Sequence, residues 1–267
     1  MDGCLLAGPA PIFQSANCKY RRTGCFKVSS RPLRQGLVIS DLHLFSPRSN
    51  AEAQLRRIKR HLERIDTLVL NGDTFDFRWS MYPNEKLSIR AALVWLERLA
   101  VMFAGRRVHY IFGNHDGLGS FRTEIEAFVR DSTVVKLHEL NLRLGRSLFF
   151  HGDCAIPAMT SLRLAAYRDA WSRDRPCGPV SSGLYAIAAS TGAGKLLHQY
   201  YFPRRATIRR VSRYLDEVLP AWRQETVDCF FGHTHLPFRN HYDGDVRFHN
   251  TGSAIRGMGF QPLFFEY

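Results

Sequence analysis

Five short polar clusters hold the side chains best suited to chemistry in this sequence. They are Asp41-x-His43, Gly72-Asp73, Gly113-Asn114-His115-Asp116, His151-Gly152-Asp153 and Gly232-His233-Thr234-His235. Carboxylate and imidazole groups are ligands that suit borderline metals such as Mn, Fe, Zn and Co. The candidate donors number seven, more than one four-coordinate metal needs: Asp41, His43, Asp73, Asn114, His151, His233 and His235. Two metal ions that share one carboxylate explain the surplus.

Taken one at a time, these clusters have ordinary explanations. Gly72-Asp73 alone is a common turn, and a lone His151 is more often a structural histidine with satisfied hydrogen bonds. The joint occurrence of all the clusters in one chain, each directly after an apolar run, favours the metal site. The glycines agree with it, because they allow a tight turn after a strand and keep side-chain bulk away from an incoming phosphate.

The apolar runs before the clusters are typical of strands that are buried on both faces. They are residues 36–40, 67–70, 108–112, 147–150 and 228–231. Helical periodicity lies between them at residues 51–64 and 87–103, and this alternation predicts an α/β fold. The carboxyl ends of parallel strands meet at one edge of a sheet, so all the clusters should gather there. Residues 243–267 are predicted to be β-strands joined by Asp-Gly and Thr-Gly turns.

Residues 154–226 break this alternation. Residues 161–171 and 206–219 have the periodicity of amphipathic helices, and the second has an apolar stripe formed by Ile208, Val211, Leu215 and Val218. We interpret the segment as a mostly helical insertion, or lid, between two core strands. Its Thr191-Gly-Ala-Gly-Lys195 stretch lacks the first Gly and the final Ser or Thr of a P-loop, so we expect an ordinary loop.

The composition is that of a globular protein, with 45% hydrophobic and 23% charged residues in a chain of 267. No apolar run approaches the length of a membrane-spanning helix. The six Cys residues form no C-x-x-C pair, which fits a reducing, cytoplasmic setting. Residues 1–35 lack the positive start and long apolar run of a secretory signal, and we expect them to be a poorly ordered leader.

The net charge of +13 is concentrated in two segments. Residues 1–35 carry six Lys and Arg against one Asp, and residues 154–226 carry eleven against five acidic residues. A positive field favours anionic partners such as phosphorylated substrates or an anionic membrane surface. Nucleic acid is less favoured, since no surface of interleaved aromatic and basic residues is evident.

Taken together, the series D-x-H, G-D, G-N-H-D, H-G-D and G-H-T-H resembles the signature of the calcineurin-like metallophosphoesterase superfamily. The resemblance covers about residues 36–255. It implies a four-layer α/β/β/α sandwich over residues 36–267, with two divalent metal ions at one edge, most simply Mn²⁺, with Fe or Zn as alternatives.

The resemblance also implies a role for each candidate residue. Asp41, His43 and His235 would hold the first ion, and Asn114, His151 and His233 the second. Asp73 would bridge the two ions. His115 would act on the phosphate as general acid or charge stabiliser, with Asp116 orienting it, and Asn114 and Asp153 would also contact the substrate.

The chemistry expected of such a site is hydrolysis of a phosphoester or pyrophosphate. Two metal ions can bind a phosphoryl group and acidify a water that attacks phosphorus in line. They also neutralise the charge that develops on the equatorial oxygens. His115 would then help the leaving oxygen to depart.

The basic helical insertion is similar to that of UDP-2,3-diacylglucosamine hydrolases of the lipid A pathway. Those enzymes cleave the pyrophosphate of a nucleotide-linked lipid at the surface of the inner membrane. The similarity implies a peripheral membrane location and substrate contacts from basic residues of the insertion: Arg204, Arg205, Arg209, Arg210 and Arg213. Against it, many members of that family have Arg where this chain has His115, and His249-Asn-Thr-Gly-Ser253 looks more like general phosphoesterases.

Other functions stay open at this point. The enzyme alternatives are a phosphodiesterase that acts on nucleotides, a phosphatase that acts on phosphoproteins, and a nuclease. A different class is a scaffold that has the phosphoesterase fold without its chemistry. A scaffold should lack several ligands, whereas here the set of candidate ligands is complete.

Overall fold

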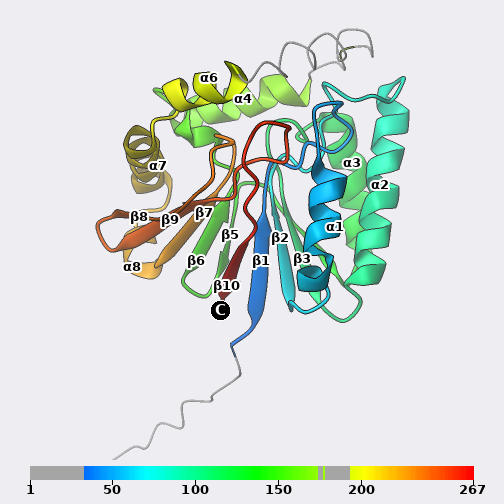
Figure 1. Ribbon diagram of the computed structural model, residues 1–267, viewed down its shortest axis with the longest axis horizontal. Helices are drawn as coiled ribbons and strands as arrows, with labels where there is room; N and C mark the ends of the chain where they lie inside the picture. Colours follow the sequence, from blue (N-terminus) through cyan, green and yellow to red (C-terminus); the bar gives the residue numbers. More distant parts are fainter. Residues whose placement is uncertain (1–32, 174–176, 178–192) are drawn as a thin grey trace, which may run out of the picture. The chain divides into compact units, whose positions relative to one another are not determined.

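The computed structural model describes residues 33–173, 177 and 193–267. The chain divides between Pro32 and Leu33, and the second unit contains all the elements named below. Two β-sheets lie face to face in this unit, with helices on the outer face of each (Figure 1). The expected four-layer α/β/β/α sandwich is therefore confirmed. Residues 1–32 of the predicted leader and residues 174–176 and 178–192 of the predicted insertion lie outside the described residues.

The first sheet has the strand order β10-β1-β2-β3-β4. Its parallel strands are β1 (Gln35–Ile39), β2 (Thr67–Asn71), β3 (Arg107–Ile111) and β4 (Val135–His138), and β10 (Leu263–Glu266) is antiparallel to β1. The helices that join the parallel strands cover its outer face: α1 (Ala51–Leu62), α2 (Glu85–Met102) and α3 (Gly119–Arg130). Sequence periodicity predicted α1 and α2 but not β4 or α3.

The second sheet has the strand order β5-β6-β7-β9-β8. It consists of β5 (Asn141–Leu144), β6 (Ser147–Phe150), β7 (Asp228–Phe231), β9 (Val246–Asn250) and β8 (Phe238–Asp243). β6, β7 and β9 are parallel, so β6 and β7 direct their carboxyl ends toward the same edge. The expected Asp-Gly turn joins β8 and β9, where Gly244 takes a φ of +61°.

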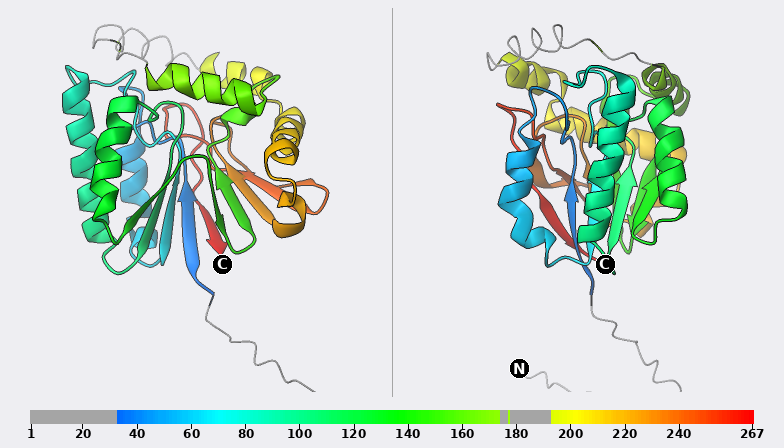
Figure 2. Two further views of the ribbon diagram at one scale, coloured as in Figure 1. Left: turned by 180° about the vertical axis from the view of Figure 1, so that it is seen from behind. Right: turned by 90° about the vertical axis from the view of Figure 1, so that its right-hand side faces the viewer.

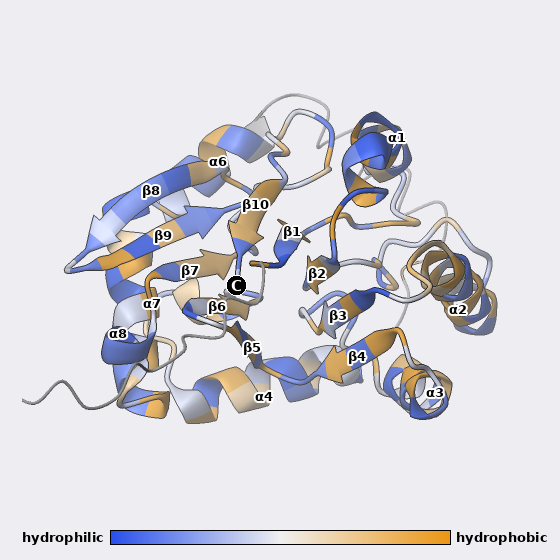
Figure 3. Ribbon diagram, turned by 90° about the horizontal axis from the view of Figure 1, so that it is seen from below, coloured by the Kyte–Doolittle hydropathy of each residue, from blue (hydrophilic) through white to orange (hydrophobic). Residues whose placement is uncertain are grey.

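The layers are held by three apolar clusters. Because side chains alternate along a strand, Leu68 and Leu70 of β2 face α1–α3, whereas Val69 faces the other sheet with Phe149 and Phe230. The third cluster lies between the second sheet and the helices of the insertion. Figure 3, seen from below, shows the strands of the two sheets between α1–α3 on one side and the helices of the insertion on the other. Burial of each such side chain contributes about 1.5–3 kcal/mol, so the layers hold the strand ends in fixed positions.

The insertion contributes η1 (Asp153–Ala155), α4 (Ser161–Ser172), α6 (Ala193–Tyr201), α7 (Arg204–Val218) and α8 (Trp222–Glu225). The two helices expected from the sequence correspond to α4 and α7. The apolar stripe of α7 is a core-packing face, since Ile208, Val211 and Leu215 are buried against the second sheet. α4 and α6 instead lie across the carboxyl ends of the strands (Figure 2). No helix in the described part of the chain has the length and apolar character needed to cross a membrane.

Candidate active site

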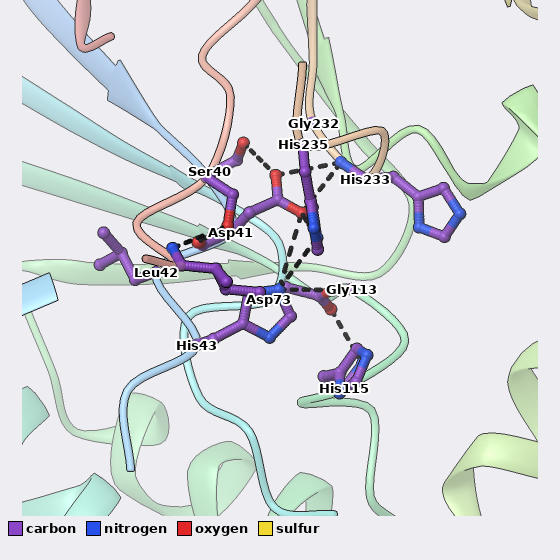
Figure 4. Close-up of polar contacts among 12 residues, drawn as sticks. Ser40, Asp41, Leu42, His43, Asp73, Gly113, His115, Gly232, His233 and His235 are labelled. Atoms are coloured by element: carbon purple, nitrogen blue, oxygen red, sulfur yellow. Dashed lines mark hydrogen bonds and ion pairs between the residues drawn. The ribbon is translucent and has the colours of Figure 1, made fainter. Parts of the chain in front are cut away.

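The polar clusters that follow β1, β2, β3, β6 and β7 meet at the edge shared by the two sheets (Figure 4). Seven side chains form two groups whose nitrogen and oxygen atoms lie within reach of common centres. The first group is Asp41, His43, Asp73 and His235, and the second is Asp73, His151 and His233, with Asn114 beside it. Asp73 belongs to both groups. The structure therefore brings together all the metal ligands that the sequence suggested, although they come from both sheets rather than one.

In the first group the two imidazoles face each other. Nε2 of His43 lies 3.1 Å from Nε2 of His235. Nε2 of His235 is also 3.3 Å from Oδ1 of Asp41, and Nε2 of His43 is 3.7 Å from Oδ2 of Asp73. Four side chains thus direct lone-pair atoms into a small buried volume, which is the arrangement of a cation site.

The second group is equally compact. Oδ1 of Asn114 lies 3.2 Å from Nε2 of His151 and 3.1 Å from Nδ1 of His233. The same His151 nitrogen is 3.4 Å from Oδ2 of Asp73. The outer nitrogen of His151 faces the carbonyl oxygen of Asn71 at 3.4 Å, a contact of the kind that fixes the ring of a ligating histidine.

Several of these residues have a backbone conformation that side chains other than Gly seldom adopt. Asp41, His43, Asp73, His233 and His235 have φ values between +47° and +63°. Each such left-handed residue costs about 1–3 kcal/mol, and it persists only where the surroundings dictate it. The strand-end loops are thus strained, and the strain turns the candidate ligands toward one another.

Two glycines are required because ligand side chains pack against their backbone. A Cβ on Gly113 would lie 2.1 Å from Oδ1 of Asp73, and a Cβ on Gly232 would lie 2.2 Å from Oδ2 of Asp41. The sequence suggested that glycine makes room for the substrate. In the structure, these two glycines make room for the candidate ligands themselves.

His115 lies beside the first group and is held by Asp76. Its Nδ1 is 3.1 Å from Oδ1 of Asp76, and its backbone N–H donates to Asp73. The other oxygen of Asp76 lies 3.4 Å from Nδ1 of His43, so one buried carboxylate faces a candidate ligand and the candidate general acid. Sequence reasoning missed Asp76, although a second carboxylate three residues after Asp73 was a usable signal.

Asp116 has a different role from the one expected. Instead of orienting His115, its carboxylate accepts hydrogen bonds from the backbone N–H groups of Thr74 and Gly113 and from the Tyr110 hydroxyl. Asp116 therefore joins the loops after β2 and β3, and Asp76 takes the position next to His115.

Asp153 forms a salt bridge with Arg168 in the structure. Both of its oxygens accept from the guanidinium of Arg168 on α4, at 2.7 Å and 3.0 Å, and its side chain is buried. Burial opposes a charge on Asp153, but Arg168 outweighs it and lowers the pKa. A carboxylate held in this way is a poor substrate ligand, and its physical effect is to anchor α4 next to His151.

The five arginines expected to bind substrate all lie on α7. Arg204, Arg205 and Arg209 are exposed. Nη1 of Arg204 is 3.3 Å from His241 of β8, and its guanidinium lies over Phe238 of the same strand. Burial, followed by Arg204 and Arg205, lowers the pKa of His241. Their substrate role stays a prediction.

Four of the candidate ligands have pKa values shifted toward the forms that bind metal. Burial opposes charge on Asp41 and Asp73, but the neighbouring imidazoles outweigh it and hold both pKa values below the ordinary value. Burial lowers the pKa of His235 to about 3, and burial with His151 lowers that of His233 to about 4. Charged carboxylates and neutral imidazoles are the forms that bind metal. Burial also opposes charge on His151, but Asp73 dominates and raises its pKa to about 10. Metal binding at His151 would therefore have to release the proton that Asp73 favours.

A model of the calcineurin-like phosphoesterase family matches residues 37–237, which is more than half of the chain. The chain belongs to this family. It is accordingly a metal-dependent phosphoester hydrolase, with a candidate metal site at the edge where the family motifs meet. A search of curated proteins finds no match.

Solved structures with a similar chain path have low similarity. A dimetal phosphatase from Danio rerio is 11% identical, with 89% of this chain and 100% of that chain covered at a TM-score of 0.40. Phosphopantetheinyl hydrolase from Mycobacterium tuberculosis is 14% identical, with 82% and 90% covered at 0.38. Vps29 from Entamoeba histolytica, complexed with Zn, is 15% identical, with 87% and 91% covered at 0.37. Similarities at this level carry no argument about the function of this chain.

Proposed function

We propose that this phosphoesterase holds two divalent ions and hydrolyses the pyrophosphate or phosphoester bond of an amphiphilic substrate. Asp41, His43 and His235 would bind one ion, Asn114, His151 and His233 the other, and Asp73 both. The observation that carries this proposal is the convergence of lone-pair atoms into two groups that share Asp73. Mixed oxygen and imidazole ligands suit Mn²⁺, and Fe or Zn are alternatives.

When bound, the ions would supply positive charge for the phosphoryl oxygens and acidity for the attacking water. The chain's own contribution to proton transfer is His115. Its Nδ1 faces Asp76, so Nε2 is the nitrogen left to give a proton to the leaving oxygen. Burial opposes charge on His115, but Asp76 and Asp73 outweigh it and raise its pKa, which favours the protonated form that a general acid needs.

An amphiphilic substrate is supported by the surface of α6. Leu196, Leu197, Tyr200 and Tyr201 are 53–79% exposed on this helix, and its His198 lies against the candidate ligand His235. An exposed apolar surface beside a phosphate site suits acyl chains or the interface of a bilayer. Helix α7 does not supply such a surface, since its apolar stripe is buried. We therefore propose a UDP-2,3-diacylglucosamine-like substrate and peripheral contact with an anionic membrane.

Assays of a panel of substrates with Mn²⁺ test both the hydrolytic activity and the preference for an amphiphilic substrate. We expect turnover of a chromogenic phosphodiester and higher kcat/KM for UDP-2,3-diacylglucosamine than for free nucleotides, phosphopeptides or DNA. No turnover of any substrate by the protein loaded with Mn²⁺, Fe²⁺ or Zn²⁺ would contradict the proposed hydrolytic activity. A preference for nucleotides or phosphopeptides would contradict the proposed lipid substrate.

Variants on α6 separate binding of the acyl chains from hydrolysis of the phosphate bond. Leu196→Gln with Leu197→Gln should lower kcat/KM for the acylated substrate at least about tenfold, since burial of even one Leu side chain is worth about 1.5–3 kcal/mol, and should leave the small phosphodiester unaffected. Val101→Gln on α2 is the control, because Val101 is 78% exposed on a helix that covers the outer face of the first sheet. Equal effects on both substrates would contradict a role of α6 in lipid binding.

A further inference from the structure

The insertion places an aromatic ring against three of the histidines in the site. Trp171 of α4 lies 4.6 Å from His115 between ring centroids. His198 of α6 lies 4.7 Å from His235, and Phe202, directly after α6, lies 5.8 Å from His233. The insertion supplies none of the seven candidate ligands, yet it touches histidines of both groups.

His235 lacks the contact that usually fixes a ligating histidine. Its Nε2 faces Asp41 and His43, so Nδ1 is the outer nitrogen. A ligating imidazole normally donates its outer N–H to a carboxylate, a carbonyl or water. Nδ1 of His235 is buried and has no hydrogen-bond partner within the described part of the chain. Among the described residues, the plane of this ring is therefore set by the groups that pack on it.

His198 is in position to do so. Its ring stacks on His235 with 17° between the planes. Its own orientation is set by Nδ1, which lies 3.1 Å from the carbonyl oxygen of Thr234 and donates to it. Phe202 packs against His233, the other candidate ligand of this loop. Its ring centroid also lies 6.1 Å from that of His198. The end of α6 and the residue after it thus contact both histidines and the Thr234 carbonyl between them.

The loop that carries these histidines needs such support. His233 and His235 both have positive φ, so the loop is strained. From the sheet side, the Asn250 side chain donates to the Gly232 carbonyl and to Thr234 Oγ1. His198 holds the same loop from the insertion side.

We propose that His198 is a positioning residue that fixes the His235 ring and the Gly232–His235 loop for metal binding, with Phe202 as its counterpart on His233. This inference rests on the proposed dinuclear site. It assigns the insertion a second task besides substrate contact: α6 maintains the affinity of the site for its ions.

Direct metal binding tests the inference without an activity assay. Chelator-treated full-length protein is titrated with Co²⁺, and the visible absorption bands and calorimetry report the affinity at each site. We expect His198→Ala to weaken the affinity of the Asp41–His43–His235 site about 10- to 100-fold, as removal of an outer partner of a ligand does. Gln199→Ala, an exposed neighbour on the same helix, should keep the wild-type affinity.

Two further variants resolve the contacts. His198→Phe keeps the stacked ring and loses the donor to Thr234, so we expect a smaller loss of affinity than in His198→Ala. Phe202→Ala should weaken the His151–His233 site instead. If His198→Ala does not fold, as judged by circular dichroism, His198→Phe and Phe202→Leu carry the test.

The outcomes separate this inference from the proposed function. Unchanged Co²⁺ affinity and spectrum in folded His198→Ala overturn the positioning role, and His198→Phe as weak as His198→Ala overturns the stacking contribution. Failure of the wild-type protein to bind two ions contradicts the proposed dinuclear site itself.

Discussion

Two clusters of Asp and His in this protein have similar composition but opposite character. The first is the candidate metal centre at the carboxyl edge of the strands. The second is Asp228, Arg247 and His249 on β7 and β9. In the second, Nε2 of His249 lies 2.9 Å from Asp228, Arg247 donates to the same carboxylate at 2.7 Å, and the backbone N–H of Asn240 points to Nδ1 of His249 at 3.4 Å.

The difference lies in how the polar atoms are matched. In the second cluster the Asp228 oxygens and Nδ1 of His249 each face a donor, so these acceptors are already matched within the protein. In the first cluster His43 and His235 direct nitrogens at each other and at carboxylates, and a shared cation is the partner that satisfies all of them. Residue types alone therefore do not define a metal site. The mutual orientation of lone pairs does, and the strained φ values at the first cluster create that orientation.

The largest effect is expected from Asp73→Ala. Asp73 belongs to both groups, so its loss should remove both ions and lower kcat/KM at least about a thousandfold, because bound metal contributes several kcal/mol to transition-state stabilisation. Metal analysis by mass spectrometry and an assay with a chromogenic phosphodiester check this. If the folded variant still binds two ions, Asp73 is not a ligand that both groups need, and the contrast with the second cluster fails.

His115→Gln should lower turnover about a hundredfold or more while two ions remain bound. The loss should be greater for a substrate with an alkyl leaving group than for a nitrophenyl ester, since a good leaving group needs little protonation. Comparison of kcat for the two substrates measures this. An equal loss for both would argue against the role of His115 as general acid.

Asp76→Asn should have a smaller effect, about 10- to 100-fold on kcat, because it acts through His115 and His43. The acidic partner raises the pKa of His115, so without it the protonated form is lost at lower pH. The alkaline limb of the pH–rate profile should therefore move to lower pH. A profile with wild-type shape would contradict this positioning role.

Asp228→Asn probes the second cluster and should leave metal content and kcat unchanged. Burial opposes charge on Asp228, but His249 and Arg247 outweigh it, and its pKa in the folded protein lies below the ordinary value. The carboxylate therefore stabilises the fold above the unfolded pKa of about 3.9, and this contribution disappears as the pH falls through the folded pKa.

We expect the free energy of unfolding of Asp228→Asn to be about 1 kcal/mol lower than that of wild type at pH 7, since the group is only half-buried. The difference should vanish in more acidic solution. Urea denaturation at a series of pH values measures it, and a difference that does not depend on pH would contradict the ion-pair explanation.

Sequence reasoning identified most of the fold and the site for a clear reason. Short apolar runs predicted the strands before each motif, and the motifs placed Asp41, Asp73 and His151 at strand ends. Some short elements escaped it, such as β4 with four residues and α6 with nine. The role of Asp116 was also assigned wrongly, because adjacency to His115 in the chain does not imply contact.

What the sequence alone determined is the set of chemical groups and their attachment to strand ends, since residue type and hydrophobic pattern are local properties. Which carboxylate reaches His115, which arginine neutralises Asp153, and which helix supports His235 were decided only by the tertiary structure. These pairings join residues distant in the chain, as in His198 with His235 or Asp73 with His151. They depend on the packing of two sheets and an insertion, which no local pattern encodes.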